Sequence, residues 1–209
     1  PWFESPLPGV KRKMLSRDGL EDGQATSLVK YDAGSQFSEH DHPLGEEILV
    51  LEGTFEDEAG TYPSGTYIKN PAGSRHMPGS AEGCQLFVKL RHLDRNDQRR
   101  VVVRPQDQRW QQGAVEGLRV LGLDSFGASS TALVSWAPRT QFQRHRHFGG
   151  EEIFVVNGDF EDEHQSYPTG TWIRSPHMST HEPFSRQGCL ILVKTGHLLP
   201  SPVTPMLMS

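Results

Sequence analysis

The sequence is poor in cysteine, in long apolar runs and in net positive charge. Its 209 residues include only two cysteines, Cys84 and Cys189, too few for a small secreted scaffold stapled by disulfides. No apolar run is long enough to cross a bilayer as a helix. The formal net charge of −5 is unlike the basic footprint of most nucleic-acid-binding proteins. Together these absences predict a cytoplasmic protein that binds neither membranes nor nucleic acids.

Glycine and proline, in contrast, are plentiful, with 21 and 15 copies. Short segments rich in Val, Ile, Leu, Phe and Thr alternate with turn residues along the whole chain. This pattern predicts an all-β protein, a sandwich or a barrel of short antiparallel strands. Residues 48–51 and 153–156 are apolar at every position, so we expect both faces of these strands to be covered. The outer face is expected to meet the other domain or another chain.

The sequence contains a long internal repeat. Residues 40–93 match residues 145–198 at a constant offset of 105, without a gap, and roughly half of the positions are identical. A period of this length is that of a whole domain rather than of a solenoid unit. We therefore predict two tandem domains, residues 1–98 and 99–209, with the boundary in the polar run HLDRNDQRR.

Each repeat carries three histidines and a glutamate at metal-ligand spacing. In the first repeat His40 and His42 stand two residues apart, so on a strand their side chains point the same way. A Pro-Leu-Gly turn then leads to Glu46, and a second Pro and Gly turn leads to His76. Imidazole and carboxylate ligands suit zinc, iron, nickel, copper and manganese.

The second repeat conserves all four of these side chains in register. They are His145, His147, Glu151 and His181. A lone His-x-His pair is usually structural, but the same quartet appearing twice while its surroundings change favours ligation. We predict one divalent metal per repeat, two per chain.

The two stretches of each repeat resemble the two sequence motifs of the cupin superfamily. The strings GEEI, YPxGT and the final PxxSxH, with the opening WxxxPxPGV, resemble ChrR-like cupin domains more closely. The second repeat departs from the cupin pattern at Arg139 and Met178, where the family has glycine, and the first has Ser80 where Asn is usual.

This resemblance implies a bicupin, two jelly-roll β-barrels with a metal inside each, often zinc. The ChrR anti-sigma protein also has a separate helical zinc domain that binds its sigma factor. The sequence has no segment like that domain, so binding of a sigma factor is not expected.

Residues near the quartets are mostly expected to have structural roles rather than to bind the metals. Glu47 and Glu152 should point away from the metals, because side chains alternate along a strand. The acidic runs 56–58 and 161–163 are expected to stabilise turns, and the two cysteines to be buried free thiols. We expect His92, His197 and Arg75 at the barrel rims, although Arg75 could also bind an anion. His177 and Met178 either narrow the second pocket or form a repacked turn.

Two functions remain open from the sequence. The first is a zinc-loaded sensor or regulatory protein that binds a small ligand, as the resemblance to ChrR implies. The second is a non-haem metal-dependent dioxygenase with Fe(II) or another transition metal in place of zinc. The resemblance implies diketone-like or hydroxyketone-like substrates for it, since some relatives of ChrR-like cupins cleave carbon–carbon bonds in such molecules. Either would bind a small molecule, and a homodimer is compatible with both because cupins commonly pair through their barrels.

Overall fold

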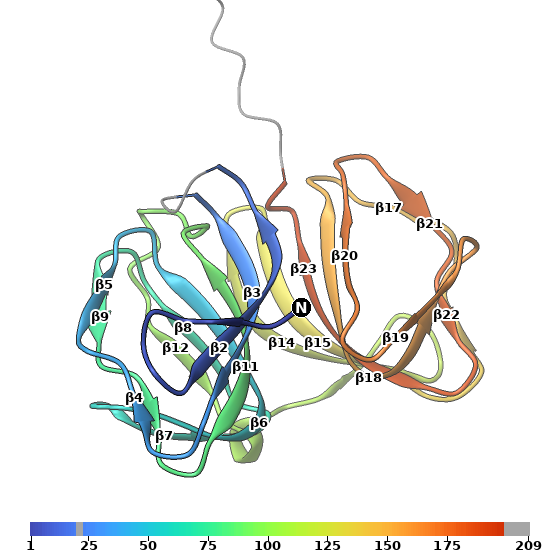
Figure 1. The fold of residues 1–209 in the computed structure, drawn as a ribbon. Helices are drawn as coiled ribbons and strands as arrows, with labels where there is room; N and C mark the ends of the chain where they lie inside the picture. The colour runs from blue at the N-terminus through green and yellow to red at the C-terminus, as the bar shows by residue number, and fades with distance from the viewer. Residues whose placement is uncertain (20–22, 199–209) are drawn as a thin grey trace, which may run out of the picture. The chain divides into compact units, whose positions relative to one another are not determined.

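The structure, a computed structural model, describes residues 1–19 and 23–198. The chain forms two tandem units, the first Pro1–Gln108 and the second beginning at Arg109. Each is a curled antiparallel β-barrel of the cupin jelly-roll type, as the sequence predicts (Figure 1). The first unit extends ten residues past the sequence-based boundary at 98, because Val101–Val103 adds a strand that pairs with residues 67–69.

The strands of the first unit are short, apart from one of twelve residues. They are β1 Phe3–Glu4, β2 Val10–Arg17, β3 Ala25–Tyr31, β4 Ser35–Gln36, β5 His40–His42, β6 Glu46–Asp57, β7 Gly60–Pro63, β8 Tyr67–Asn70, β9 Ser74–His76, β10 Gly79–Ser80, β11 Cys84–Leu90 and β12 Val101–Val103. A 3-10 turn, η1 Pro105–Asp107, follows. Among the described residues no helix is long and apolar enough to span a membrane.

The second unit repeats this order. Its strands are β13 Gln111–Gln112, β14 Leu118–Phe126, β15 Ser129–Trp136, β16 Thr140–Gln141, β17 His145–Arg146, β18 Glu151–Glu161, β19 Ser166–Pro168, β20 Trp172–Ser175, β21 Thr180–His181, β22 Phe184–Ser185 and β23 Cys189–Thr195. The sheet orders correspond: β1-β2-β3-β11-β6-β10-β4 in the first unit and β13-β14-β15-β23-β18-β22-β16 in the second. In each unit a separate two-stranded ribbon, β5-β9 or β17-β21, carries the histidines, except that His147 directly follows β17.

A β-bulge lies in the middle of the longest strand of each unit. Opposite β11, strand β6 has one extra residue at Leu51, and β18 has one extra at Val156 opposite β23. Gly53 and Gly158 follow with φ of 70° and 78°. A Cβ at Gly53 would lie 2.1 Å from the carbonyl oxygen of Gly83, so only glycine fits. The bulge bends the strand and exchanges the inward and outward sets of side chains.

The barrel interior holds the apolar core. In the first unit it includes Val29, Ile48, Val50 and Phe55, and in the second it includes the equivalent residues of β15 and β18. Three consecutive residues, Ile48 to Val50, are all buried, as are residues 153–155. The prediction that both faces of these strands are covered is confirmed for these positions.

Candidate metal centres

The first candidate centre gathers side chains from β5, β6 and β9. The antiparallel pairing of β5 and β9 sets His40 directly opposite His76. The Nε2 atoms of His42 and His76 lie 2.9 Å apart. The carboxylate of Glu46, at the start of β6, lies 3.1 Å from His76 Nε2 and 3.5 Å from His42 Nε2. All four residues singled out in the first repeat therefore lie together.

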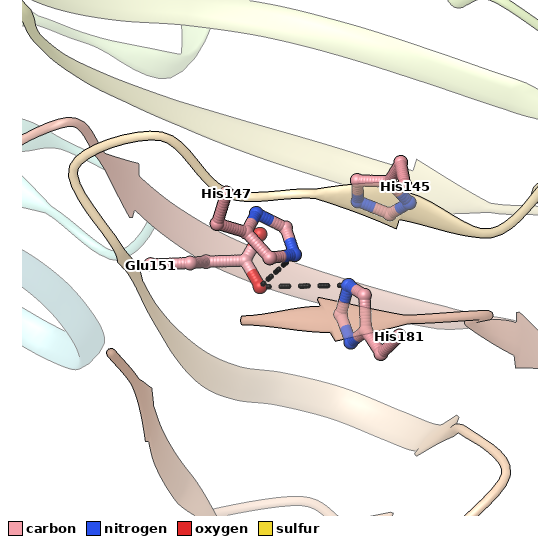
Figure 2. Close-up of side chains that lie close together, drawn as sticks. All are labelled: His145, His147, Glu151 and His181. Carbon is pink, nitrogen blue, oxygen red and sulfur yellow. Dashed lines mark ion pairs between the residues drawn. The ribbon is translucent and has the colours of Figure 1, made fainter. Parts of the chain in front are cut away.

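The second candidate centre is built in the same way from β17, β18 and β21 (Figure 2). Glu151 Oε2 lies 3.4 Å from His147 Nε2 and 3.6 Å from His181 Nε2. Ligand atoms of His145, His147, Glu151 and His181 all lie within 4.8 Å of one another. In the first centre, ligand atoms of His40, His42 and His76 lie within this distance of one another, but Glu46 does not join the group.

The difference between the two glutamates has a local cause. Asn70 Nδ2 donates a hydrogen bond of 2.8 Å to Glu46 Oε1, and Arg100 Nε in turn donates to Asn70 Oδ1 at 3.0 Å. In the second unit Ser175 stands at the position of Asn70, and Glu151 Oε2 has no hydrogen-bond partner among the described residues. Both glutamates thus face two histidines, but Glu46 is also held by an amide, whereas Glu151 Oε2 is not.

The outer histidines present Nε2 to the centres. His40 Nδ1 donates to the Ser38 carbonyl and His145 Nδ1 to the Gln143 carbonyl, both at 3.0 Å. A backbone carbonyl can only accept, so Nδ1 carries a proton, and in the neutral imidazole Nε2 then holds the lone pair that can bind a metal.

An aspartate stands behind the last histidine of each quartet. Asp57 Oδ2 lies 3.7 Å from His76 Nδ1, and Asp162 Oδ2 lies 4.0 Å from His181 Nδ1. Each carboxylate also accepts a hydrogen bond from a tyrosine hydroxyl, Tyr62 or Tyr167. A carboxylate behind a ligating histidine orients the ring and raises its basicity. The sequence interpretation gave these aspartates only a role in turns, which they also have, since each accepts a backbone N–H two residues on.

Burial shifts the pKa of several groups in the two centres. It lowers the pKa of His42, His147 and His181 to about 4, and so favours neutral imidazoles, the form that binds metals. Burial also raises the pKa of Glu151 to about 8. Burial acts to lower the pKa of His76 as well, but Asp57 and Glu46 outweigh it and the pKa is raised.

These residues fit a divalent cation. In the second centre His147 Nε2 and Glu151 Oε2 are both buried, yet neither makes a hydrogen bond within the described part of the chain. Buried polar atoms without partners are costly and rare. A metal ion bound by the three imidazoles and the carboxylate would satisfy them, and this donor set suits zinc, iron or manganese.

Comparison with protein families decides the relationship. The family model described as "ChrR Cupin-like domain" matches the chain twice, over residues 1–94 and 98–199. The chain belongs to the ChrR cupin-like family. No curated protein matches it.

Solved structures share the fold of this ChrR-like bicupin at low identity. A candidate dioxygenase from Nostoc punctiforme PCC 73102 has a TM-score of 0.77 at 15% identity, covering 95% of this chain and 77% of that one. AerE from Microcystis aeruginosa has a TM-score of 0.67 at 15% identity, covering 93% and 95%. Oxalate decarboxylase from Bacillus subtilis has a TM-score of 0.68 at 14% identity, covering 92% and 74%.

The two departures of the second ChrR-like domain from the cupin pattern keep the backbone of the glycines they replace. Arg139 and Met178 have φ of 65° and 68°, close to the 78° and 82° of Gly34 and Gly73 in the first domain. His177 accepts a hydrogen bond from the Gly149 N–H at 2.8 Å, and neither it nor Met178 lines the second cavity described below. Of the two alternatives for this segment, the structure favours the repacked turn.

Other residues of the ChrR-like bicupin fall near their expected places. Glu47 and Glu152 turn away from the centres, where Glu47 accepts a hydrogen bond from Tyr67. The expectation that His92 and His197 lie at the rims is wrong: both imidazoles are largely buried and pair with Glu47 and Glu152.

Arg75 is exposed and pairs with Asp41 and Glu39. It is therefore a rim residue and does not line the first cavity. Cys84 and Cys189 are free, buried thiols, as the sequence interpretation expects.

A cavity adjoins each centre. The first has a volume of about 150 Å³ and is lined by His40, His42, Glu46 and His76. The second has a volume of about 210 Å³ and is lined by His145, Glu151 and His181. Both also have walls of core side chains from the barrel. A small molecule in either cavity would touch the candidate ligands directly.

Proposed function

We propose that this ChrR-like bicupin is a non-haem metal-dependent dioxygenase that acts on a small diketone-like or hydroxyketone-like substrate. The observation that carries the proposal is the cavity beside each quartet. A structural zinc site is closed by its protein ligands, whereas a catalytic centre keeps a position open to substrate. Cavities lined by the ligands themselves are what an open centre requires.

Different residues of each barrel would bind the metal, orient its ligands and exclude water. The three histidines and the glutamate hold the metal, which when bound would supply Lewis-acid and redox chemistry. Asp57 and Asp162 orient the last histidine of each quartet. Apolar walls such as Phe55 and Phe160 exclude water from the cavities.

Two of the structural neighbours have functions compatible with this proposal. One is a candidate dioxygenase, and oxalate decarboxylase from Bacillus subtilis contains Mn(II) centres. At about 15% identity these neighbours support the fold of a metal-dependent cupin rather than its substrate.

A zinc-loaded sensor or regulatory protein is the second candidate. The convergence of all four donors in the second centre favours it, because structural zinc typically has four protein ligands. In this case the metal would stabilise the barrel and a small ligand would bind nearby without turnover.

We also propose a cytoplasmic location, which the two free thiols support. We further propose that the protein forms a homodimer and does not bind a sigma factor.

One experiment separates the two functions. The protein is purified without added metal for elemental analysis, then loaded with Fe(II), and O₂ consumption is followed on a panel of diketones and hydroxyketones. Uptake of O₂ that depends on iron and on one substrate is expected for the dioxygenase. Tightly held zinc with no O₂ uptake under any loading would reject the dioxygenase in favour of the sensor. The double variant His40→Ala/His42→Ala provides the control for the first centre.

A further inference from the structure

The two cavities differ in charge although the quartets beside them are the same. Arg12 and Arg91 line the first cavity. The second is lined, apart from its candidate ligands, by aliphatic and aromatic side chains alone. The barrels therefore offer different environments to whatever binds beside each centre.

The sheet register gives the counterpart of Arg12. Arg12 on β2 pairs with Val29 on β3, and Val120 on β14 pairs with Val134 on β15. Val29 and Val134 are equivalent in the repeat, and all four side chains line the cavities. Directly opposed residues of an antiparallel pair share a face of the sheet. Val120 therefore occupies in the second barrel the place of Arg12 in the first.

Arg12 has an unmet hydrogen-bonding capacity. Its Nε is buried, and among the described residues it has neither a hydrogen-bond acceptor nor a carboxylate in ion-pair contact. Its guanidinium carbon lies 5.8 Å from the centre of the Phe37 ring, which in turn lies 5.7 Å from the ring of His40. A buried N–H without an acceptor, such as this one, is costly unless a ligand in the cavity accepts from it.

Arg91 strengthens the contrast. Its φ of 64° lies in the left-handed region, which disfavours residues with a side chain. Its counterpart in the second repeat is Gly196, where a Cβ would lie 1.8 Å from the Ala128 carbonyl oxygen. The first barrel thus keeps a strained arginine where the second excludes any side chain, and retained strain is a mark of function.

The acidic residues that line the first cavity interact with residues other than Arg12. Asp41 accepts a hydrogen bond of 2.6 Å from Arg75, outside the cavity lining. Glu46 accepts from Asn70 and faces two histidines of the centre. Neither carboxylate pairs with Arg12.

We propose that the first cavity binds a small organic carboxylate, held by Arg12 beside the metal centre, and that the second binds an uncharged ligand. This inference rests on the proposed metal-dependent function and assigns a different ligand class to each centre. Arg12 would be a binding residue that accounts for charge selectivity, whereas Val120 and Trp136 give the second cavity its preference for apolar groups.

The test uses lactate and its neutral isostere lactamide as probes on the full-length Zn(II)-loaded protein. Binding is measured by calorimetry on the wild type, on Arg12→Gln and Arg12→Lys, and on the matched control Val120→Gln. We expect one equivalent of lactate per chain, at least about tenfold weaker binding in Arg12→Gln, and partial retention in Arg12→Lys. Lactate affinity in Val120→Gln and lactamide affinity in Arg12→Gln should be unchanged.

Two kinds of result would overturn the inference. The first is lactate binding that is equal in both barrels or unchanged in Arg12→Gln. The second is a loss of lactamide affinity in Arg12→Gln as large as the loss of lactate affinity. Elemental analysis of the same samples reports the proposed function separately, because a chain without zinc fails that proposal whatever its affinity for lactate. Thermal unfolding verifies that each variant is folded, and Arg12→Lys provides the test if Arg12→Gln is not.

Discussion

Asp57 and Asp162 show how much of each centre depends on residues that touch no metal. Burial acts to raise the pKa of Asp57, but the nearby His76 imidazole and the hydrogen bonds from Tyr62 and the Ala59 N–H outweigh it and lower the pKa. The carboxylate therefore stays ionised at neutral pH. An anion in that place favours a His76 ring oriented with Nε2 toward the centre.

Removing that charge should weaken the first centre alone. We expect Asp57→Asn to reduce the affinity of the first centre for Zn(II) by about tenfold to a hundredfold, because the carboxylate behind His76 orients its ring. Competition with a chromophoric chelator measures this affinity. Asp162→Asn should affect the second centre equally, and the exposed Glu52→Gln should affect neither. Equal affinities in Asp57→Asn and wild type would refute this role.

The two cysteines should be chemically inert in the folded protein. Burial raises the pKa of Cys84 and of Cys189 to about 11, so the reactive thiolate is scarce at pH 7.5. Iodoacetamide should therefore modify neither residue in the native state and both after denaturation, as mass spectrometry would show. Rapid alkylation of either thiol in the folded protein would contradict the burial.

At the scale of single elements, the bulges of β6 and β18 decide which residues face the centres. Before the bulge, Glu46, Ile48 and Val50 point inward; after it, Phe55 and Asp57 do. Asp57 stands eleven positions after Glu46, so simple alternation would place the two side chains on opposite faces. The extra residue at Leu51 restores them to the same face.

This bulge explains what sequence reasoning missed. The quartets were predictable because they are short-range and repeat at a fixed offset. The aspartates were not, since their orientation depends on an insertion that hydrophobic periodicity does not show. Arg12 and Val120 were also hidden, because the opening segments of the two repeats do not keep the offset of 105 residues. Arg100, which supports Asn70, lies beyond the predicted domain boundary.

The glycine after each bulge should be intolerant of substitution. A Cβ at Gly158 would lie 2.2 Å from the Gly188 carbonyl oxygen, and its φ is 78°. We expect Gly158→Ala to destabilise the protein by about 3 kcal/mol, combining the left-handed strain with overpacking. Gly170→Ala, with a φ of 84° and open space around it, should cost only about 1 kcal/mol. Urea unfolding measures both, and equal losses would show that the close contact is unimportant.

At the scale of the whole molecule, duplication has kept two quartets and changed the cavities around them. Each centre draws its ligands from one unit alone, so each should bind its metal without the other. The first barrel combines an amide-held glutamate with two arginines. The second combines apolar walls with a glutamate whose Oε2 accepts no hydrogen bond from the described residues. Because the metal ligands are the same and the cavity walls differ, we expect the two barrels to bind different small molecules.

The most direct test of this account is the metal content of the wild type and of two double variants. His40→Ala/His42→Ala removes two donors from the first centre, and His145→Ala/His147→Ala removes two from the second. The account predicts two equivalents of divalent metal per wild-type chain and one in each variant, with both variants still folded. A wild-type chain that binds no metal, or double variants that keep the full wild-type content, would contradict it.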